Sequence, residues 1–175
     1  IPSYSTNTAV EFPIHDYIPA VFMKLFGTNE PWIFHVYILL YSIVGFFFLY
    51  LLSEKICRSK IKAALVVIFA MTSPVYVYYQ GGFLPSIPSI ANTLIAFYCY
   101  ALYFEGGGKK WFRWALFFFT FAVLARFTYV IPFFAVLGFE MIRIIQRKAK
   151  FWPNIIGVSV SFLVVFAAQY YNSTL

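Results

Sequence analysis

The chain has 175 residues, of which 62% are apolar, 23% are aromatic and only 11% are charged. Soluble domains carry about 25% charged residues and roughly 45–50% apolar residues, so this composition excludes an ordinary soluble globule and a disordered chain. The net charge of +7 does not indicate nucleic-acid binding, because the basic residues lie in short segments between apolar runs. We therefore expect an all-α, polytopic transmembrane bundle that contacts membrane lipids and no nucleic acid.

Residues 1–30 are too polar to cross a membrane and are predicted to form an extracytoplasmic loop with a juxtamembrane helix. Seven apolar residues recur there at the spacing of one helix face, namely Ile14, Tyr17, Ile18, Val21, Phe22, Leu25 and Phe26. His15, Asp16 and Lys24 lie off this face. A short amphipathic helix in the outer interface is therefore expected, with a kink at Pro19 and with His15 and Asp16 in water unless they serve a site.

Residues 31–175 are predicted to form a transmembrane domain of about six spans, because about 20 apolar residues in a helix cross a hydrocarbon core of roughly 30 Å. The predicted spans are 31–53, 63–79, 84–104, 111–125, 129–145 and 153–171. As one straight helix, residues 111–145 would be about 52 Å long, which is too long for a single crossing. We divide this stretch at 126–128, so that both of its basic flanks lie on the same side of the membrane.

Eleven of the 13 basic residues lie in three short segments between predicted spans or in the span turns next to them. These residues are Lys55, Arg58, Lys60 and Lys62, then Lys109, Lys110 and Arg113, then Arg143, Arg147, Lys148 and Lys150. Basic loops of membrane proteins face the cytoplasm, so we place all three segments there and the turns at 80–82 and 126–128 outside. The two cysteines, Cys57 and Cys99, indicate neither a disulfide nor a metal site.

Carboxylates are nearly absent from the predicted spans, since Glu140 is the only one of six acidic residues that lies within a span. Its position one turn from a basic segment predicts a paired or interfacial charge. Ion-coupled transporters need titratable or cation-binding groups near the middle of the membrane. The spans therefore argue against such a transporter.

The polar residues that can carry chemistry collect on the predicted outer side. Glu11 and Asp16 are carboxylates that can act as a general base, and Arg126 has a planar fork of donors that can hold a phosphate. Arg126 is flanked by spans on both sides, so it either extends to the interface or meets an anion. Three further residues are candidates to contact an acceptor or to line the cavity, namely His15, Lys24 and Gln80.

Five short segments resemble those of the GT-C membrane glycosyltransferases. They are EFPIHDYIPA at 11–20, MKLFG at 23–27, SPVY at 73–76, FLPS at 83–86 and LAR at 124–126. The group they resemble most comprises bacterial relatives of dolichyl-phosphate-mannose protein mannosyltransferase and of the lipid A aminoarabinose transferase. In this family a Pro-Pro-Leu-like motif opens a juxtamembrane helix, and Phe12-Pro13-Ile14 resembles that motif. Two positions depart from the family, because Ser86 replaces a frequent Asp and His35 a frequent Arg.

The resemblance implies transfer of a sugar from a polyprenyl-phosphate donor to a lipid, glycan or protein acceptor at the outer face of a bacterial inner membrane. A carboxylate base would activate the acceptor, and Arg126 would hold the leaving lipid phosphate. The family's catalytic Asp lies some tens of residues before the Pro-Pro-Leu-like motif. We therefore expect the base upstream of Ile1, in a longer polypeptide of which this sequence is a piece, with Glu11 and Asp16 as the alternatives within the sequence.

A divalent metal is used in some branches of this family, but Glu11 and Asp16 alone do not make a ligand set, so no cofactor is assigned. A transporter or flippase of lipid-linked sugars is the alternative function, because the same outer cavity could bind the lipid without chemistry. The third possible function is that of a structural membrane subunit, which would need neither a base nor a phosphate contact.

Overall fold

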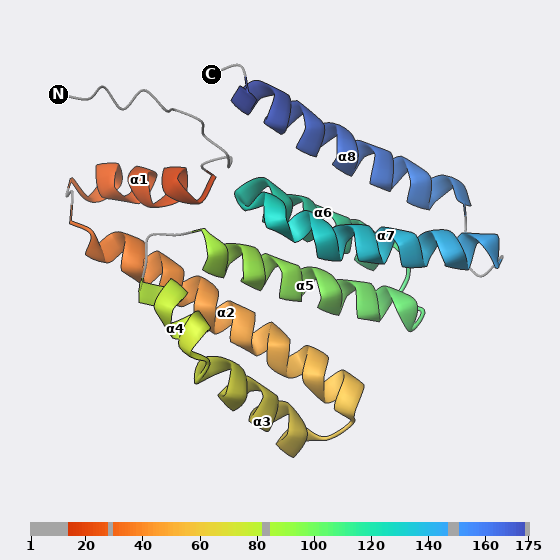
Figure 1. The fold of residues 1–175 in the computed structure, drawn as a ribbon, viewed down its shortest axis with the longest axis horizontal. Coiled ribbons are helices and arrows are strands. Elements are labelled where there is room, and N and C mark those ends of the chain that lie inside the picture. Colours follow the sequence, from red (N-terminus) through yellow and green to blue (C-terminus); the bar gives the residue numbers. More distant parts are fainter. Residues whose placement is uncertain (1–13, 28–29, 82–84, 147–150, 174–175) are drawn as a thin grey trace.

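The computed structural model describes residues 14–27, 30–81, 85–146 and 151–173. Every regular element in these ranges is a helix (Figure 1). They are α1 (Ile14–Phe26), α2 (Trp32–Cys57), α3 (Lys60–Met71), α4 (Pro74–Gly81), α5 (Ser86–Phe104), α6 (Lys109–Ala125), the 3-10 turn η1 (Phe127–Tyr129), α7 (Val130–Ile145) and α8 (Phe151–Ser173). The predicted all-α class is confirmed.

Three of the described helical segments are long and apolar enough to cross a membrane: Trp32–Cys57, Ser86–Phe104 and Phe127–Ile145. A fourth crossing is possible if α3 and α4 act together, although the two helices meet at an angle of 58°. These segments establish an integral membrane protein of polytopic type. The total of six spans stays a prediction, as does their orientation.

Helix α5 lies in the middle of the bundle, with α2 on one side and α6 on the other (Figure 1). Small residues allow this arrangement, because Gly45 of α2 lies so close to α5 that an added Cβ would stand 3.1 Å from the Cβ of Ala91. Across α5, Phe97 packs edge-on against Phe119 of α6, with ring centroids 5.2 Å apart. Close packing of this kind is what joins helices in lipid, where apolar burial alone provides no driving force.

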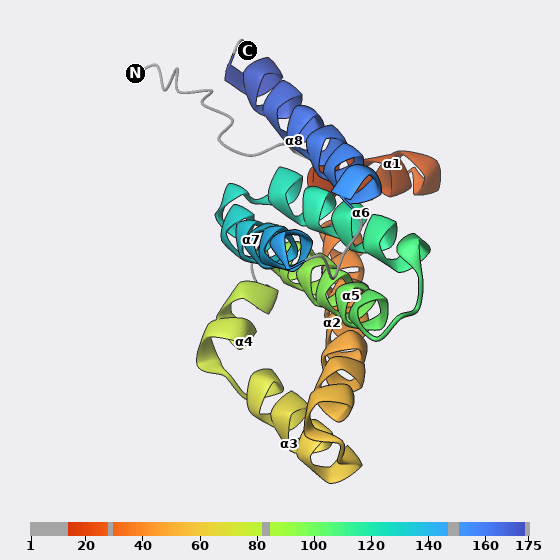
Figure 2. The same cartoon turned by 90° about the vertical axis from the view of Figure 1, so that its right-hand side faces the viewer.

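The segment predicted as one span over 63–79 is broken into α3 and α4. Thr72 ends α3 with its backbone N–H and its hydroxyl both bonded to the Ile68 carbonyl, each at 3.0 Å. Pro74 begins α4, and a proline has no N–H with which to continue the preceding helix. As a result α3 and α4 form a bent arm that diverges from the rest of the bundle (Figure 2).

Helix α1 packs against the bundle with the face opposite to its apolar face. Five residues of the predicted apolar face are exposed, namely Tyr17, Val21, Phe22, Leu25 and Phe26. His15 and Pro19 are buried instead, and His15 retains only 1% of its accessible surface. The expectation that His15 lies in water is therefore wrong, because the apolar face is turned outward, where it can enter lipid, and the His15 face contacts the bundle.

Candidate functional site

Arg126 stands at the junction between α6 and η1, where the helix stops. Its backbone is extended (φ −154°, ψ 114°), and its N–H still donates to the Ala122 carbonyl at 3.0 Å. Its own carbonyl accepts from the Tyr129 N–H at 3.0 Å, which starts the next turn. The chain is thus fixed on both sides of Arg126, and its side chain is directed toward the beginning of α5.

The Arg126 guanidinium joins three helices. Its Nη1 donates a hydrogen bond to the Oγ of Ser86, the buried first residue of α5. Its Cζ lies 5.7 Å from the centroid of the Tyr79 ring in α4, within the range of a cation–π contact. A guanidinium is planar and has five N–H donors, so contacts of this kind orient the group.

A cavity of about 580 Å³ lies beside Arg126, between the bent arm and the α5–η1 side of the bundle. Hydroxyl groups are frequent in its wall, which includes Ser73, Tyr76, Tyr79, Ser86, Thr128 and Tyr129. The remaining wall is apolar and includes Phe69, Val75 and Ile90. We call this space the Arg126 cavity. A guanidinium and several hydroxyls suit a phosphate and a sugar, and the apolar wall suits a hydrocarbon chain.

The described wall of the Arg126 cavity contains no carboxylate, so the general base is not located by this geometry. Glu11 lies outside the described residues. Asp16 belongs to α1, but the position of its side chain also lies outside what the structure describes. The assignment of the base to either residue, or to the upstream region, stays a prediction.

His15 joins α1 to two other helices rather than lining the Arg126 cavity. Its Nδ1 lies 2.5 Å from the Tyr37 hydroxyl of α2, and the Phe121 ring of α6 meets its imidazole edge-on at 5.7 Å. Its Nε2 is buried and has no hydrogen-bond partner among the described residues. Burial lowers the pKa of His15 from 6.5 to about 4, because the charged imidazolium loses its hydration. The imidazole is therefore neutral at physiological pH.

Lys24 and Gln80, the other predicted lining residues, also lie outside the wall of the Arg126 cavity. Lys24 is exposed in the last turn of α1, and Gln80 is half-buried near the end of α4. Of the predicted residues whose side chains are described, the structure therefore places only Arg126 in this cavity. Acceptor contacts by His15, Lys24 and Gln80 remain predictions.

A divalent metal has no evident place among the described residues, which contain no group of three or more His, Cys, Asp or Glu side chains. The sequence offered Glu11 and Asp16 as the carboxylates closest to a metal-ligand set. The structure does not describe their side chains. We derive no step through a metal.

Sequence reasoning missed the tyrosines of the Arg126 cavity. Tyr76 is fixed in its wall by donating to the Ser42 hydroxyl of α2 at 3.1 Å, while Tyr79 lies against Arg126. Tyr129 contributes from the other side of the cavity. The sequence did show tyrosines crowded before the turn at 80–82, but aromatic residues are also common at any membrane interface. The sequence therefore did not distinguish tyrosines that line a cavity from tyrosines at the membrane interface.

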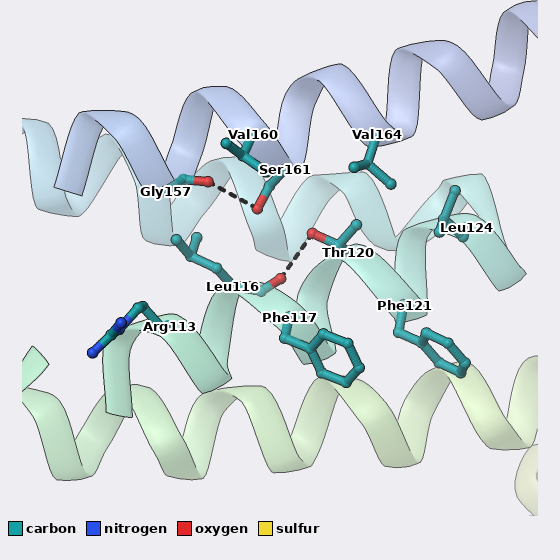
Figure 3. Close-up of a pocket in the computed structure, with 10 residues that line it drawn as sticks. All are labelled: Arg113, Leu116, Phe117, Thr120, Phe121, Leu124, Gly157, Val160, Ser161 and Val164. Atoms are coloured by element: carbon teal, nitrogen blue, oxygen red, sulfur yellow. Dashed lines mark hydrogen bonds between the residues drawn. The ribbon is translucent and has the colours of Figure 1, made fainter. Parts of the chain in front are cut away.

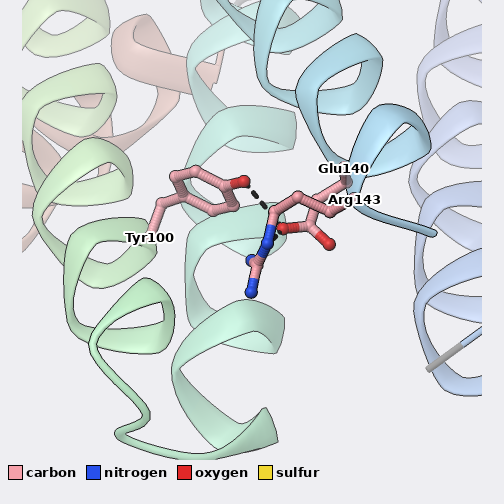
Figure 4. Close-up of polar contacts among 3 residues, drawn as sticks. All are labelled: Tyr100, Glu140 and Arg143. Carbon is pink, nitrogen blue, oxygen red and sulfur yellow. Dashed lines mark hydrogen bonds and ion pairs between the residues drawn. The ribbon is translucent and has the colours of Figure 1, made fainter. Parts of the chain in front are cut away.

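A second polar cluster lies at the other end of α5 and involves the only acidic residue in a predicted span. Glu140 is buried and accepts hydrogen bonds on Oε1 from the Tyr100 hydroxyl at 2.7 Å and from Arg143 Nη1 at 2.6 Å (Figure 4). The guanidinium also lies over the Tyr103 and Phe104 rings, at 5.3 and 4.9 Å. The prediction of a paired charge at Glu140 is confirmed.

Comparison with known proteins adds one finding. The sequence model of a family described as dolichyl-phosphate-mannose-protein mannosyltransferase matches residues 10–171. No curated protein and no solved structure matches the chain. The matched range includes every described residue of the Arg126 cavity.

Proposed function

Since the chain belongs to the dolichyl-phosphate-mannose-protein mannosyltransferase family, we propose that it transfers a sugar from a polyprenyl-phosphate donor to a lipid, glycan or protein acceptor. The match confirms the resemblance drawn from the short segments at 11–27, 73–76, 83–86 and 124–126. It also identifies the protein as a membrane glycosyltransferase. The donor, the acceptor and the residues that act on them are the proposed part.

The single observation that carries the proposal is the Arg126 cavity. A polyprenyl-phosphate sugar has an anionic phosphate, a hydroxylated sugar and a hydrocarbon chain. Arg126 can hold the phosphate, the hydroxyls of Tyr79 and Thr128 can contact the sugar, and the apolar wall can receive the first part of the chain. The cavity thus offers a group of suitable chemistry for each part of the donor.

The proposed reaction is a displacement at the anomeric carbon. An acceptor hydroxyl loses its proton to a carboxylate base and its oxygen bonds to the anomeric carbon, while the bond from that carbon to the phosphate oxygen breaks. The lipid phosphate leaves with the bonding electrons, and Arg126 stabilises the charge that develops on it. The base is the upstream Asp that the family resemblance implies, with Glu11 or Asp16 as the alternatives in this sequence.

We place this reaction at the outer face of a bacterial inner membrane. The support is the distribution of basic residues, because Lys55 and Lys109 belong to the end of the bundle opposite Arg126. Labelling tests the orientation. Gly81→Cys, in a background without Cys57 and Cys99, should react with an impermeant thiol reagent from outside, whereas native Cys57 alone, which is also exposed, should not. Outside labelling of Cys57 would overturn this placement.

A transfer assay tests the function itself. Membranes containing the intact polypeptide, supplied with a polyprenyl-phosphate sugar labelled in the sugar, should transfer label to an acceptor and release the polyprenyl phosphate. Arg126→Ala should lose most of this activity, and Lys60→Gln, which removes an exposed cation at the start of α3, should retain it. If both variants keep full transfer activity, Arg126 does not belong to the donor site.

The same assay separates the enzyme from a transporter or flippase. A transporter moves the intact lipid-linked sugar, so no free polyprenyl phosphate accumulates. Release of polyprenyl phosphate in proportion to labelled acceptor supports the transferase. Movement of intact donor across sealed vesicles without release would establish transport instead.

A further inference from the structure

A second cavity, separate from the Arg126 cavity, lies between α6 and α8 (Figure 3). Its volume is about 440 Å³, and its walls run from Arg113 to Leu124 on α6 and from Gly157 to Val164 on α8. The two helices approach closely at Gly157, where an added Cβ would stand 2.8 Å from Leu116 Cδ1. We call this space the Arg113 groove.

The wall of the Arg113 groove is effectively apolar except at one end. Its two hydroxyl groups are bonded within their own helices, Thr120 to the Leu116 carbonyl at 2.8 Å and Ser161 to the Gly157 carbonyl at 3.1 Å (Figure 3). Neither hydroxyl needs a partner from a ligand. The guanidinium of Arg113 is thus the remaining polar group of the described lining, and it lies at the end of the groove away from Leu124.

Positive charge accumulates at this end of the groove. Arg113 forms no ion pair among the described residues, because the described pairs join Lys55 to Glu105 and Arg143 to Glu140. Lys109 and Lys110 precede Arg113 by four and three residues, so all three cations share one side of α6. An anion placed there would meet favourable charge from three side chains.

The length of the groove matches one leaflet of a bilayer. Leu124 lies eleven residues after Arg113, which places the two about 16 Å apart along α6 at about 1.5 Å per residue. The hydrocarbon core of a bilayer is roughly 30 Å thick, so the groove extends across about half of it. A phospholipid has the same distribution of chemistry over the same length, with an anionic phosphate at one end of a hydrocarbon chain.

We propose that the Arg113 groove binds an anionic phospholipid from the leaflet that faces the basic loops. The lipid phosphate contacts Arg113, with Lys109 and Lys110 adding charge, and one acyl chain lies between Phe117 and Val160. The bound lipid fills the space beyond the close approach at Gly157 and so holds α8 against α6. This inference is independent of the proposed glycosyl transfer.

Lipid retention in detergent tests the proposal. The purified protein is mixed with equal amounts of phosphatidylglycerol and phosphatidylcholine, and bound lipid is counted by native mass spectrometry. Phosphatidylglycerol should be retained preferentially. A cation at a membrane surface changes the affinity for an anionic lipid about fivefold, so Arg113→Gln should reduce that preference by about this factor. Lys62→Gln, which removes an exposed cation from the first turn of α3, should leave the preference unchanged.

A second variant tests the apolar part of the groove while keeping the charge. Val160→Trp fills the space from the exposed side of α8 and should release the lipid without altering Arg113. Because Arg113 is exposed, Arg113→Gln is expected to fold, and its melting temperature in detergent without added lipid checks this.

Three results would overturn the proposal. Equal retention of the two phospholipids by the wild type would show that charge does not select the ligand. Retention of polyprenyl phosphate in preference to phosphatidylglycerol by the wild type, lost in Val160→Trp, would assign the groove to the sugar donor. A dimer that forms without lipid and is lost in Val160→Trp would assign it to a second copy of the chain.

Discussion

Arg126 and Arg143 lie at opposite ends of α5 and are held in different ways. Arg143 bonds to a buried carboxylate, Glu140, and its guanidinium lies over two aromatic rings (Figure 4). Arg126 contacts the Ser86 hydroxyl and the Tyr79 ring, and it forms part of the wall of a cavity. A buried ion pair between packed side chains stabilises helix packing, whereas a guanidinium that lines a cavity can also bind a ligand. The same residue type thus serves structure at one end and, in our proposal, donor binding at the other.

The largest effect should follow from breaking the pair at the Arg143 end. Glu140→Ala leaves the Arg143 guanidinium and the Tyr100 hydroxyl without their shared acceptor in a mostly buried position. Removal of one member of a buried pair costs about 3–5 kcal/mol of folding free energy. We expect a marked fall in the melting temperature of the detergent-solubilised protein and in its yield.

A double variant provides the control. Glu140→Gln with Arg143→Met removes both charges and should recover most of the stability that Glu140→Ala loses, because a buried pair replaced by uncharged groups is often neutral. If Glu140→Ala is as stable as the wild type, the Glu140–Arg143 pair does not contribute more to folding stability than Arg126 does.

Replacing Arg126 should affect turnover more than stability. Charge-assisted hydrogen bonds to a phosphate are worth about 1.5–3 kcal/mol, so Arg126→Ala in the intact polypeptide should lose about tenfold to a hundredfold in donor-dependent turnover. Arg126→Lys keeps the charge but not the planar fork of donors, and it should lose much of the same activity. Both are measured as kcat/KM for the donor at matched expression.

Changes at the two ends of α5 should have opposite effects: loss of the Glu140–Arg143 pair should lower stability, and loss of Arg126 should lower turnover. Arg126→Ala with normal turnover and a large loss of stability would make Arg126 a structural residue like Arg143. In that case the donor phosphate must be held elsewhere, and the proposed role of the Arg126 cavity fails.

Acid should loosen the docking of α1 against the rest of the bundle. The folded-state pKa of His15 is about 4, below the ordinary value of 6.5, so the docked helix excludes a proton that the undocked helix binds. The docked state is therefore fully stable above pH 6.5 and loses about 1.4 kcal/mol for each pH unit between 6.5 and 4. Hydrogen exchange of the α1 amides at pH 7.5 and pH 5, corrected for the intrinsic pH dependence of exchange, should show this loss.

Two variants isolate the contribution of His15. His15→Phe has no imidazole to protonate and should make α1 docking independent of pH in this range, whereas His35→Gln, at the exposed second histidine, should leave the response as in the wild type. An unchanged pH response in His15→Phe would exclude His15 as its cause.

The smallest effect is expected at the second ion pair of the Arg143 end. Lys55 and Glu105 join α2 to the loop after α5, but the Glu105 side chain is 53% exposed. Exposed pairs contribute about 0–1 kcal/mol, so Lys55→Gln should lower the melting temperature of the detergent-solubilised protein only slightly. A loss comparable to that of Glu140→Ala would show that burial is not what distinguishes the two pairs.

The fold class followed from the sequence because a membrane constrains composition directly. Long apolar runs must be helices in lipid, so segments such as 84–104 were predicted close to the observed Ser86–Phe104. The break at residues 72 and 73 was not predicted. Hydropathy continues across it, and only Pro74 marks the point where the helix ends.

The rotation of each helix about its axis was the information that the sequence lacked. An amphipathic pattern predicted the apolar face of α1 correctly, but this face is the exposed one, and His15 packs against the bundle. For a membrane protein, lipid and protein interior are both apolar, so an apolar face does not reveal which of the two it meets. Arg126 was predicted because charge between two spans is rare, whereas Tyr79 and Tyr129 required the three-dimensional contacts.

The two walls of the Arg126 cavity differ in how firmly they are built into the bundle. On the α5 side, the wall includes Ser86, which is buried in the first turn of α5 beside the buried Ile87. On the other side, none of the residues of α4 is buried, and the helix begins after a 58° bend. Widening the cavity on the α4 side therefore separates no buried residue of α4, although it breaks the hydrogen bond from Tyr76 to Ser42. Widening it on the α5 side separates buried residues of the bundle. In our proposal, the long-chain donor therefore enters the cavity sideways from the bilayer, past α4, without leaving the hydrocarbon phase.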